Sequence, residues 1–329
     1  MRCIKNKSAV AAPWKTSKPL SSTRSATPQH APSRLDMPLL GTLLVMLTLW
    51  ASAFPAITAS LKHYTPGHVA LARYLVASLV LVVVAIAQRW PLPEARDVPV
   101  LALMGLLGFT IYNFALNVGQ KVTPAGVASF LVNVSPVFVV IFAAAFLREK
   151  VTPAGWAGIC ISLVGMALLA QAKGGGFRLN PGALLIVVAA FSAAVYTILQ
   201  KRYLRKYGPV HLVAYCIWCG TFFMLAFAPG LLNELQRAPA GATLTIVYMG
   251  VFPTAIAYTI WGYVLSRIAV SVAVSFIYLV PVLATLMAHF WLGEVLTMHS
   301  LVGGFLALLG VVVVNTLGRT KAAPENEVE

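Results

Sequence analysis

The sequence predicts an all-α integral membrane protein with ten transmembrane helices, arranged as two inverted five-helix repeats. Three observations lead to this fold class. The 329 residues are 59% hydrophobic and 10% charged, whereas soluble domains carry about 25% charged residues. Apolar runs of membrane-spanning length follow one another with short polar breaks. Finally, residues 122–169 match residues 268–314 in a constant register.

An α-helix needs about 20 apolar residues to cross the hydrocarbon core of a bilayer. The segments that meet this requirement are residues 38–58, 67–88, 99–119, 124–147, 155–171, 181–200, 210–231, 243–264, 269–292 and 300–318. Most connections between them are short. They leave no room for a soluble catalytic domain.

The internal match is a repeat with an offset of 145 residues. The identical pairs are Pro136 and Pro281, Glu149 and Glu294, Thr152 and Thr297, Gly158 and Gly303, and Gly165 and Gly310. Because each repeat crosses the membrane an odd number of times, the second repeat must insert upside down. Inverted repeats of this kind place a binding site near the bilayer midplane, between the halves.

The repeat divides the chain into four parts. We expect a first five-helix repeat over residues 37–172 and a second over residues 181–318, with a C-terminal tail over residues 319–329. Residues 1–36 are polar and have no acidic residue before Asp36. They fit a disordered cytoplasmic tail, an over-long start with Met37 as the initiator, or a transit peptide; we favour the first two.

The distribution of Lys and Arg predicts the orientation. With the N-terminus inside, the inner segments carry 18 of these residues and the outer loops carry 5. The positive-inside rule therefore places both termini in the cytoplasm. A bacterial inner membrane is the expected location. The net charge of +15 follows from this pattern and does not indicate a nucleic-acid partner, since no basic face with interleaved aromatic residues is present.

No cofactor, metal site or catalytic residue is expected. Cys216 and Cys219 form a CxxC, but it lies inside an apolar segment without a βαβ pattern. Small residues that pack helices are the better interpretation.

Polar and aromatic residues at helical spacing form candidate linings of a neutral cavity, because polar groups in membranes usually face the bundle interior. The candidates are Asn113 with Asn117, Ser129 with Asn133, Tyr196, Tyr258 with Trp261, and Tyr278. The alternative is ordinary hydrogen bonding between helices.

Pro136 and Pro281 interrupt the hydrogen-bond ladders of their expected helices. A kink that takes part in gating and a static kink are both consistent with this pattern.

Three charged residues are candidates for a structural or coupling role. Arg73 is the one basic residue well inside an expected helix. It needs an anion, carbonyls or water, with Glu294 as a possible partner, or it snorkels to the interface. Glu149 and Glu294 end their helices, each three residues before a Thr. This spacing favours capping of the next helix, with a proton relay as the alternative.

These residues resemble the EamA-like family of the drug/metabolite transporter superfamily, with two EamA repeats. The resemblance rests on residues 50–54 (WASAF), Arg73, Gly105, residues 125–136 and the two repeated Glu-x-x-Thr and Gly sets. It covers roughly residues 38–318. The resemblance implies ten transmembrane helices, alternating access and export of small metabolites, amino acids or drugs. It adds Trp50 to the expected cavity lining, and it favours packing or gating for Arg73 over direct substrate contact.

We therefore expect a secondary transporter that exports small neutral or zwitterionic metabolites, such as amino acids. Its partners are the lipid bilayer and a small solute, while a coupling proton and the oligomeric state stay open. Proton-coupled efflux of drugs is less favoured because no Asp or Glu lies mid-helix. A membrane sensor or scaffold would need a sizeable soluble segment. An enzyme would need clustered His, Asp or Glu at one membrane face.

Overall fold

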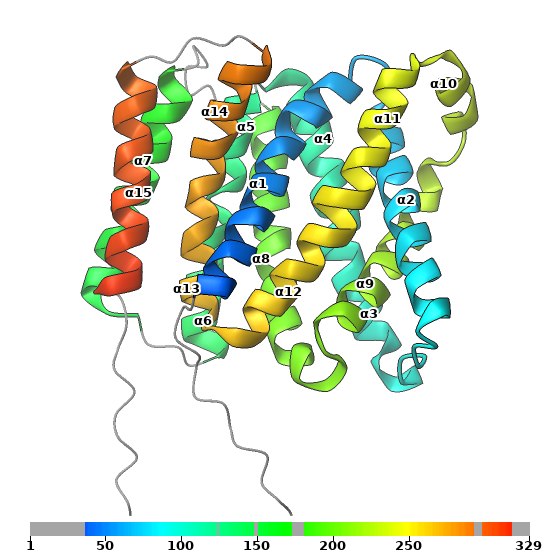
Figure 1. Cartoon of the computed structure of the whole chain (residues 1–329), viewed down its shortest axis with the longest axis horizontal. Helices are drawn as coiled ribbons and strands as arrows, with labels where there is room; N and C mark the ends of the chain where they lie inside the picture. The colour runs from blue at the N-terminus through cyan, green and yellow to red at the C-terminus, as the bar shows by residue number, and fades with distance from the viewer. Residues whose placement is uncertain (1–36, 124, 148–150, 173–180, 293–297, 318–329) are drawn as a thin grey trace, which may run out of the picture. The chain divides into compact units, whose positions relative to one another are not determined.

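A computed structural model describes residues 37–123, 125–147, 151–172, 181–292 and 298–317. Within these ranges every element is a helix and no strand occurs (Figure 1). The expected tails, residues 1–36 and 319–329, and the carboxylates of Glu149 and Glu294 lie outside the described residues.

The first half of the chain contains α1 (Met37–Ser60), α2 (Pro66–Ala87), the 3-10 helix η1 (Ala95–Asp97), α3 (Val98–Gly105), the π-helix η2 (Leu106–Ile111), α4 (Tyr112–Val122), α5 (Ala125–Val132), α6 (Ser135–Phe146) and α7 (Pro153–Ala172). The second half contains α8 (Pro181–Tyr207), α9 (Pro209–Met224), the 3-10 helix η3 (Leu225–Phe227), α10 (Leu231–Arg237), α11 (Ala240–Met249), the π-helix η4 (Gly250–Ile256), α12 (Ala257–Arg267), α13 (Val270–Ser275), the 3-10 helix η5 (Phe276–Leu279), α14 (Val280–Leu292) and α15 (Met298–Thr316).

In the described part of the chain, six helical rods are long and apolar enough to cross a membrane. They are Met37–Ser60, Pro66–Ala87, Ala95–Val122, Pro181–Tyr207, Pro209–Phe227 and Ala240–Arg267. Each of the other four expected segments holds a shorter apolar helix: Ser135–Phe146, Pro153–Gly165, Val270–Ala284 and Val302–Val314. Length and composition thus establish an apolar, all-helical membrane protein.

Two glycines explain why the second half departs from the expected boundaries. Gly208 has a φ of 73° and separates α8, which extends seven residues beyond the expected end, from α9. Gly230 has a φ of 88° and begins a separate helix, α10, where one segment was expected to continue to residue 231. Residues with a side chain rarely adopt such φ values, whereas glycine does so readily.

The expected helix over residues 124–147 is interrupted. The α5 helix ends at Val132 and α6 begins at Ser135, so that Pro136 lies in the first turn of a new helix. Proline is well tolerated there because the N–H that it lacks would have no partner. Pro281 occupies the same position in α14, after the 3-10 helix η5. Pro136 therefore follows an interruption between two helices, whereas Pro281 follows a 3-10 segment within one helical run, Val270–Ala284. A role of either proline in gating stays a prediction.

Both halves also contain a π-helix, which lies within the third expected segment of each half. Gly105 precedes η2 and Gly250 opens η4, at the repeat offset of 145 residues. The two glycines make reciprocal contacts. A Cβ on Gly105 would lie 2.6 Å from the carbonyl oxygen of Cys216 in α9, and one on Gly250 would lie 2.7 Å from the carbonyl oxygen of Arg73 in α2. Cys216 is fully buried, so packing accounts for this part of the CxxC.

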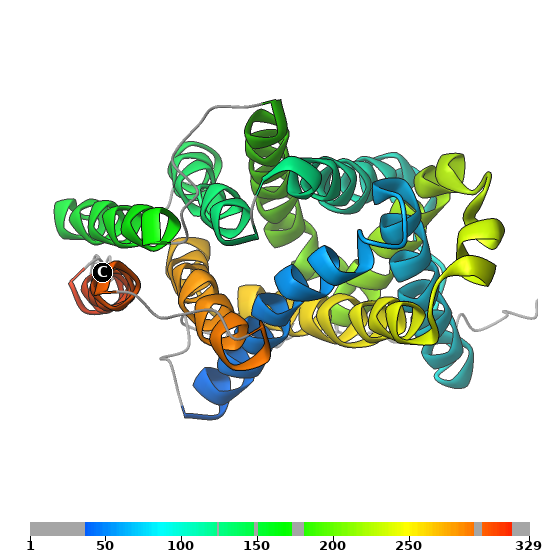
Figure 2. The ribbon, with the colours of Figure 1, turned by 90° about the horizontal axis from the view of Figure 1, so that it is seen from above.

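The α7 and α15 helices lie side by side in both views (Figures 1 and 2) and approach each other closely through small residues. A Cβ on Gly158 would lie 2.8 Å from the carbonyl oxygen of Gly310, and one on Gly310 would lie 2.6 Å from the backbone nitrogen of Ser162. Such small-residue contacts drive helix association in membranes, where hydrophobic burial between helices adds little.

We expect Gly310→Ala to destabilise the protein by about 1–3 kcal/mol, the usual range for overpacking. The new methyl group would overlap the Ser162 backbone, which cannot rotate away. Thermal melting of the purified protein measures the effect. Gly304→Ala, on the same helix, is the control because its Cβ would approach nothing closer than Val282 at 3.6 Å. Equal melting temperatures for the two variants would contradict the close packing.

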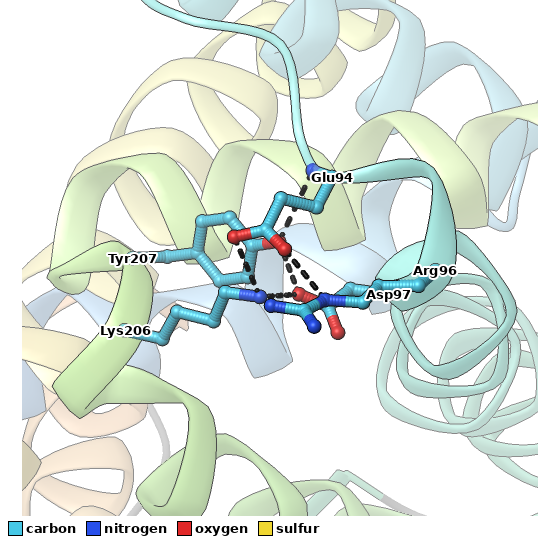
Figure 3. A network of polar contacts seen from close by, with 5 residues as sticks. All are labelled: Glu94, Arg96, Asp97, Lys206 and Tyr207. Atoms are coloured by element: carbon cyan, nitrogen blue, oxygen red, sulfur yellow. Dashed lines mark hydrogen bonds and ion pairs between the residues drawn. The ribbon is translucent and has the colours of Figure 1, made fainter.

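Polar contacts join helix ends that the orientation analysis placed on one side. Lys206 at the end of α8 contacts Asp97 and, at 2.8 Å, Glu94 (Figure 3). Tyr207 donates to Asp97, and Arg96 lies 2.6 Å from Glu94. At the end expected to be outer, His68 lies 2.6 Å from Glu234. These contacts agree with the expected grouping of the loops.

The hydrogen bond from Lys206 holds the pKa of Glu94 below its ordinary value of 4.5. A lowered folded-state pKa stabilises the fold above the unfolded value, and this stabilisation is lost as the pH falls through the folded value. We therefore expect Lys206→Gln to lower the melting temperature at pH 7, with a difference from wild type that shrinks below about pH 4.5. The exposed Arg202→Gln removes the same charge nearby and should have no comparable effect.

Candidate functional site

A cavity of about 100 Å³ lies among helices of both halves. Its walls come from residues 50–139 of the first half and 193–280 of the second. The lining residues are Trp50, Ala53, Phe54, Ile57, Arg73, Gly108, Tyr112, Leu116, Val132, Asn133, Ser135, Pro136, Val139, Ala193, Tyr196, Thr197, Tyr258, Trp261, Val274, Ile277 and Val280. A single buried water needs about 10–15 Å³, so the cavity can hold several waters or a small solute.

Aromatic rings form one wall of this cavity, in which Trp50, Tyr196, Tyr258 and Trp261 line the space and Phe109 joins Tyr258 to Tyr196 from behind. The centroid of Tyr258 lies 5.3 Å from that of Trp50 and 5.0 Å from that of Phe109. Trp50 also lies 5.5 Å from Trp261, and Phe109 lies 5.1 Å from Tyr196. These tilted and edge-on arrangements are favourable for aromatic pairs. The wall can accept apolar side chains and, through ring faces, a cationic group.

Arg73 brings a positive charge to the cavity from a position about two turns into α2. Its side chain is 5% exposed, so it does not snorkel to the interface. Its Nε donates to Thr254 Oγ1 at 2.5 Å and its Nη1 donates to Asn113 Oδ1 at 3.4 Å. The guanidinium carbon also lies 5.7 Å from the centroid of the Tyr74 ring. All of these partners are neutral.

The π-helix η4 explains how Thr254 is presented to Arg73. Pro253 has no N–H to donate to the Met249 carbonyl four residues earlier. Thr254 Oγ1 donates to that carbonyl at 2.8 Å. Because the hydroxyl proton is used in this bond, the oxygen can only accept from Arg73.

Asn113 accepts the second hydrogen bond of the guanidinium and lies outside the cavity lining. Its Nδ2 donates to the Phe109 carbonyl and to the Tyr74 hydroxyl, both at 2.8 Å. These two bonds orient its Oδ1 as the acceptor for Arg73. Asn113 is fully buried and is not part of the lining.

Asn133 lies at the break between α5 and α6 and faces the cavity. Its Nδ2 donates to the Ser129 carbonyl at 2.6 Å. Its Oδ1 is buried and has no hydrogen-bond partner among the residues that the structure describes. Since an unsatisfied buried acceptor is costly, this oxygen is available to a donor on a bound solute or water.

The carboxylates of the described part of the chain lie away from the cavity. Glu94 and Asp97 contact Lys206, and Glu234 contacts His68 and accepts from the backbone N–H of Thr65. Within the same residues, no group of His, Cys, Asp and Glu could hold a metal ion. Arg73 is therefore the one charged residue in the described lining.

The structure brings seven of the twelve predicted site residues that it describes to this cavity. Trp50, Asn133, Tyr196, Tyr258, Trp261, Pro136 and Arg73 line it. The predicted residues outside the described lining are Asn113, Asn117, Ser129, Tyr278 and Pro281. Asn117 donates instead to the Pro66 carbonyl at 3.1 Å, and Tyr278 is fully buried.

Sequence reasoning missed Tyr112 and Leu116, which line the cavity together with Gly108 at a spacing of four. Asn113 and Asn117 have the same spacing of four, but each follows a lining residue by one position and so belongs to a neighbouring face of the helix. The π-helix η2, which precedes these residues, adds backbone per turn and rotates the following face. No sequence signal distinguishes these two faces.

A model of the EamA-like transporter family matches residues 38–171 and again residues 180–316. The chain belongs to the EamA-like transporter family. It is a membrane transporter, and members of this family move solutes and are not enzymes.

Two relatives match this chain over most of their own length. The uncharacterized transporter YdfC of Bacillus subtilis (strain 168) is 42% identical over 267 residues, which are 81% of this EamA-like chain and 87% of YdfC. A "probable terminal-alkyne amino-acid exporter" of Streptantibioticus cattleyicolor is 39% identical over 283 residues, covering 85% of this chain and 95% of the exporter.

An experimental structure supports the fold. A protein crystal structure aligns with a TM-score of 0.69 and 22% identity, over 86% of this chain and 98% of the other. This likeness concerns the fold of the EamA-like chain alone.

Proposed function

We propose that this EamA-like protein is a secondary transporter that exports small neutral or zwitterionic metabolites, such as amino acids, by alternating access. The observation that carries the proposal is the cavity at the seam between the two halves. Its walls come from both halves and are mainly aromatic, apolar and neutral polar. A central site between repeats is where secondary transporters bind their solutes.

The proposal includes ten transmembrane helices in two inverted repeats. Reciprocal contacts support it: Gly105 of the first half packs on α9, and Gly250 of the second half packs on α2. The π-helices and the prolines at the second position of α6 and α14 also recur at equivalent positions. Reporter fusions at both termini test the topology, and reporters on opposite sides of the membrane would refute it. Cytoplasmic reporters at both ends are expected.

The size of the cavity favours small solutes. Sites for drug-sized ligands have volumes of about 300–1,000 Å³, whereas this cavity measures about 100 Å³. The relative named as an amino-acid exporter supports the same class. Efflux of larger drugs is therefore the less favoured alternative.

Proteoliposome flux measurements test the function. Purified protein is reconstituted and supplied with labelled alanine, leucine and phenylalanine, with and without an imposed proton gradient. We expect saturable flux of at least one amino acid. Stimulation by the gradient would identify proton coupling. Flux equal to that of empty liposomes for all three would contradict the proposal and favour a sensor or scaffold.

A further inference from the structure

The guanidinium of Arg73 is a buried cation that faces a cavity without a described counter-charge. It carries five N–H donors, and its described contacts to Thr254 and Asn113 use two of them. An arginine stays protonated in proteins. Because Arg73 lines the cavity, its charge and its remaining donors are available to a solute there.

Packing alone does not account for this arrangement. Thr254 and Asn113 are themselves held by bonds to Met249, Phe109 and Tyr74. Together they fix the Nε and Nη1 groups and so orient the plane of the guanidinium. Such a planar, oriented donor set matches the two oxygens of a carboxylate.

The charge balance of the cavity indicates the charge of the group that Arg73 binds. The described lining contains one positive charge and no negative charge. A singly charged anion neutralises it, whereas a phosphate group carries more negative charge than one arginine balances. The aromatic wall leaves room for the uncharged or cationic remainder of the same solute.

We propose that Arg73 binds the carboxylate of the transported solute, so that the protein selects monocarboxylates such as amino acids over the corresponding amides. Thr254 and Asn113 act as positioning residues. This inference rests on the proposed function for its transport step, but its binding step can be measured separately.

The test compares each amino acid with its carboxamide, which differs only in lacking the carboxylate. The melting temperature of the purified protein is measured with alanine, leucine and phenylalanine and with their amides, since a ligand that binds the folded state raises it. The same compounds then compete for labelled amino-acid flux in proteoliposomes. We expect the acids to bind and to compete at least tenfold better than the amides.

Variants of Arg73 test the residue itself. Arg73→Gln should remove the preference for acids over amides, and Arg73→Lys should restore only part of it because it lacks the fork. Thr254→Val should raise the KM for acids with little change in kcat. Arg202→Gln, an exposed arginine on α8, is the matched control and should keep the full preference.

Each result decides between the proposals. If amino acids are transported but the amides compete as well as the acids, the role of Arg73 is overturned and the proposed function stands. Selective binding of acids without any flux would support Arg73 and contradict transport of these solutes. If neither acids nor amides bind or move, both proposals fail. Should Arg73→Gln not fold, the acid and amide comparison on the wild-type protein remains decisive.

Discussion

Tyr258→Ala is expected to reduce amino-acid flux at least tenfold in proteoliposomes. The Tyr258 ring joins Trp50 to Phe109 and forms the middle of the aromatic wall. Its removal takes away one face of the solute site and the support for the Trp50 ring. A tenfold loss corresponds to about 1.4 kcal/mol, which is within reach of one lost aromatic or cation–π contact.

Two variants separate this effect from general damage. Tyr258→Phe keeps the ring and should retain most of the flux if the ring is what contacts the solute. Tyr263→Ala removes a tyrosine from the same helix, α12, but from an outward position that is 38% exposed. Comparable flux in Tyr258→Ala and wild type, at equal amounts of folded protein, would remove the aromatic wall from the proposed site.

Asn133→Ala should also lower flux at least tenfold while the protein remains folded. Asn133 lines the cavity, and its Oδ1 has no donor within the described part of the chain, so a solute donor that binds this oxygen would lose its partner. Loss of a hydrogen bond to a charged group costs about 1.5–3 kcal/mol, or roughly tenfold to a hundredfold in binding. Concentration dependence of the flux measures the change.

Asn117→Ala is the matched control for Asn133. Asn117 is buried to a similar degree, but it donates to the Pro66 carbonyl and lies outside the described lining. We expect it to lower the melting temperature and to preserve the solute affinity. An unchanged KM for Asn133→Ala, or the same KM shift in both variants, would mean that Asn133 has a structural role only.

The helical segments could be read from the sequence because lipid imposes a strong constraint on composition. Every expected segment contains a helix in the described structure. The interruptions could not be read in the same way. In the sequence, residues 124–147 form one apolar run. The helix is interrupted before Pro136, and such an interruption is tolerated in a membrane only where the irregular backbone is buried in protein or lines a cavity.

The lining illustrates a second limit. Polar residues at helical spacing led to Tyr258, Trp261 and Asn133, which line the cavity, and also to Asn113, which does not. Asn113 instead holds Arg73. Spacing identifies residues that share a face, but a π-helical turn upstream decides where that face points.

The sequence by itself determined that this chain is an apolar helical protein with an internal repeat and one arginine deep in a helix. Composition and the spacing of identical residues can be read along the chain without knowing how its helices pack. Only the tertiary structure decided what Arg73 meets. Its partner Thr254 lies 181 residues away and is presented by a π-helix that contains Pro253. The position of a partner so distant depends on how whole helices pack, and hydrophobic patterns do not encode that packing.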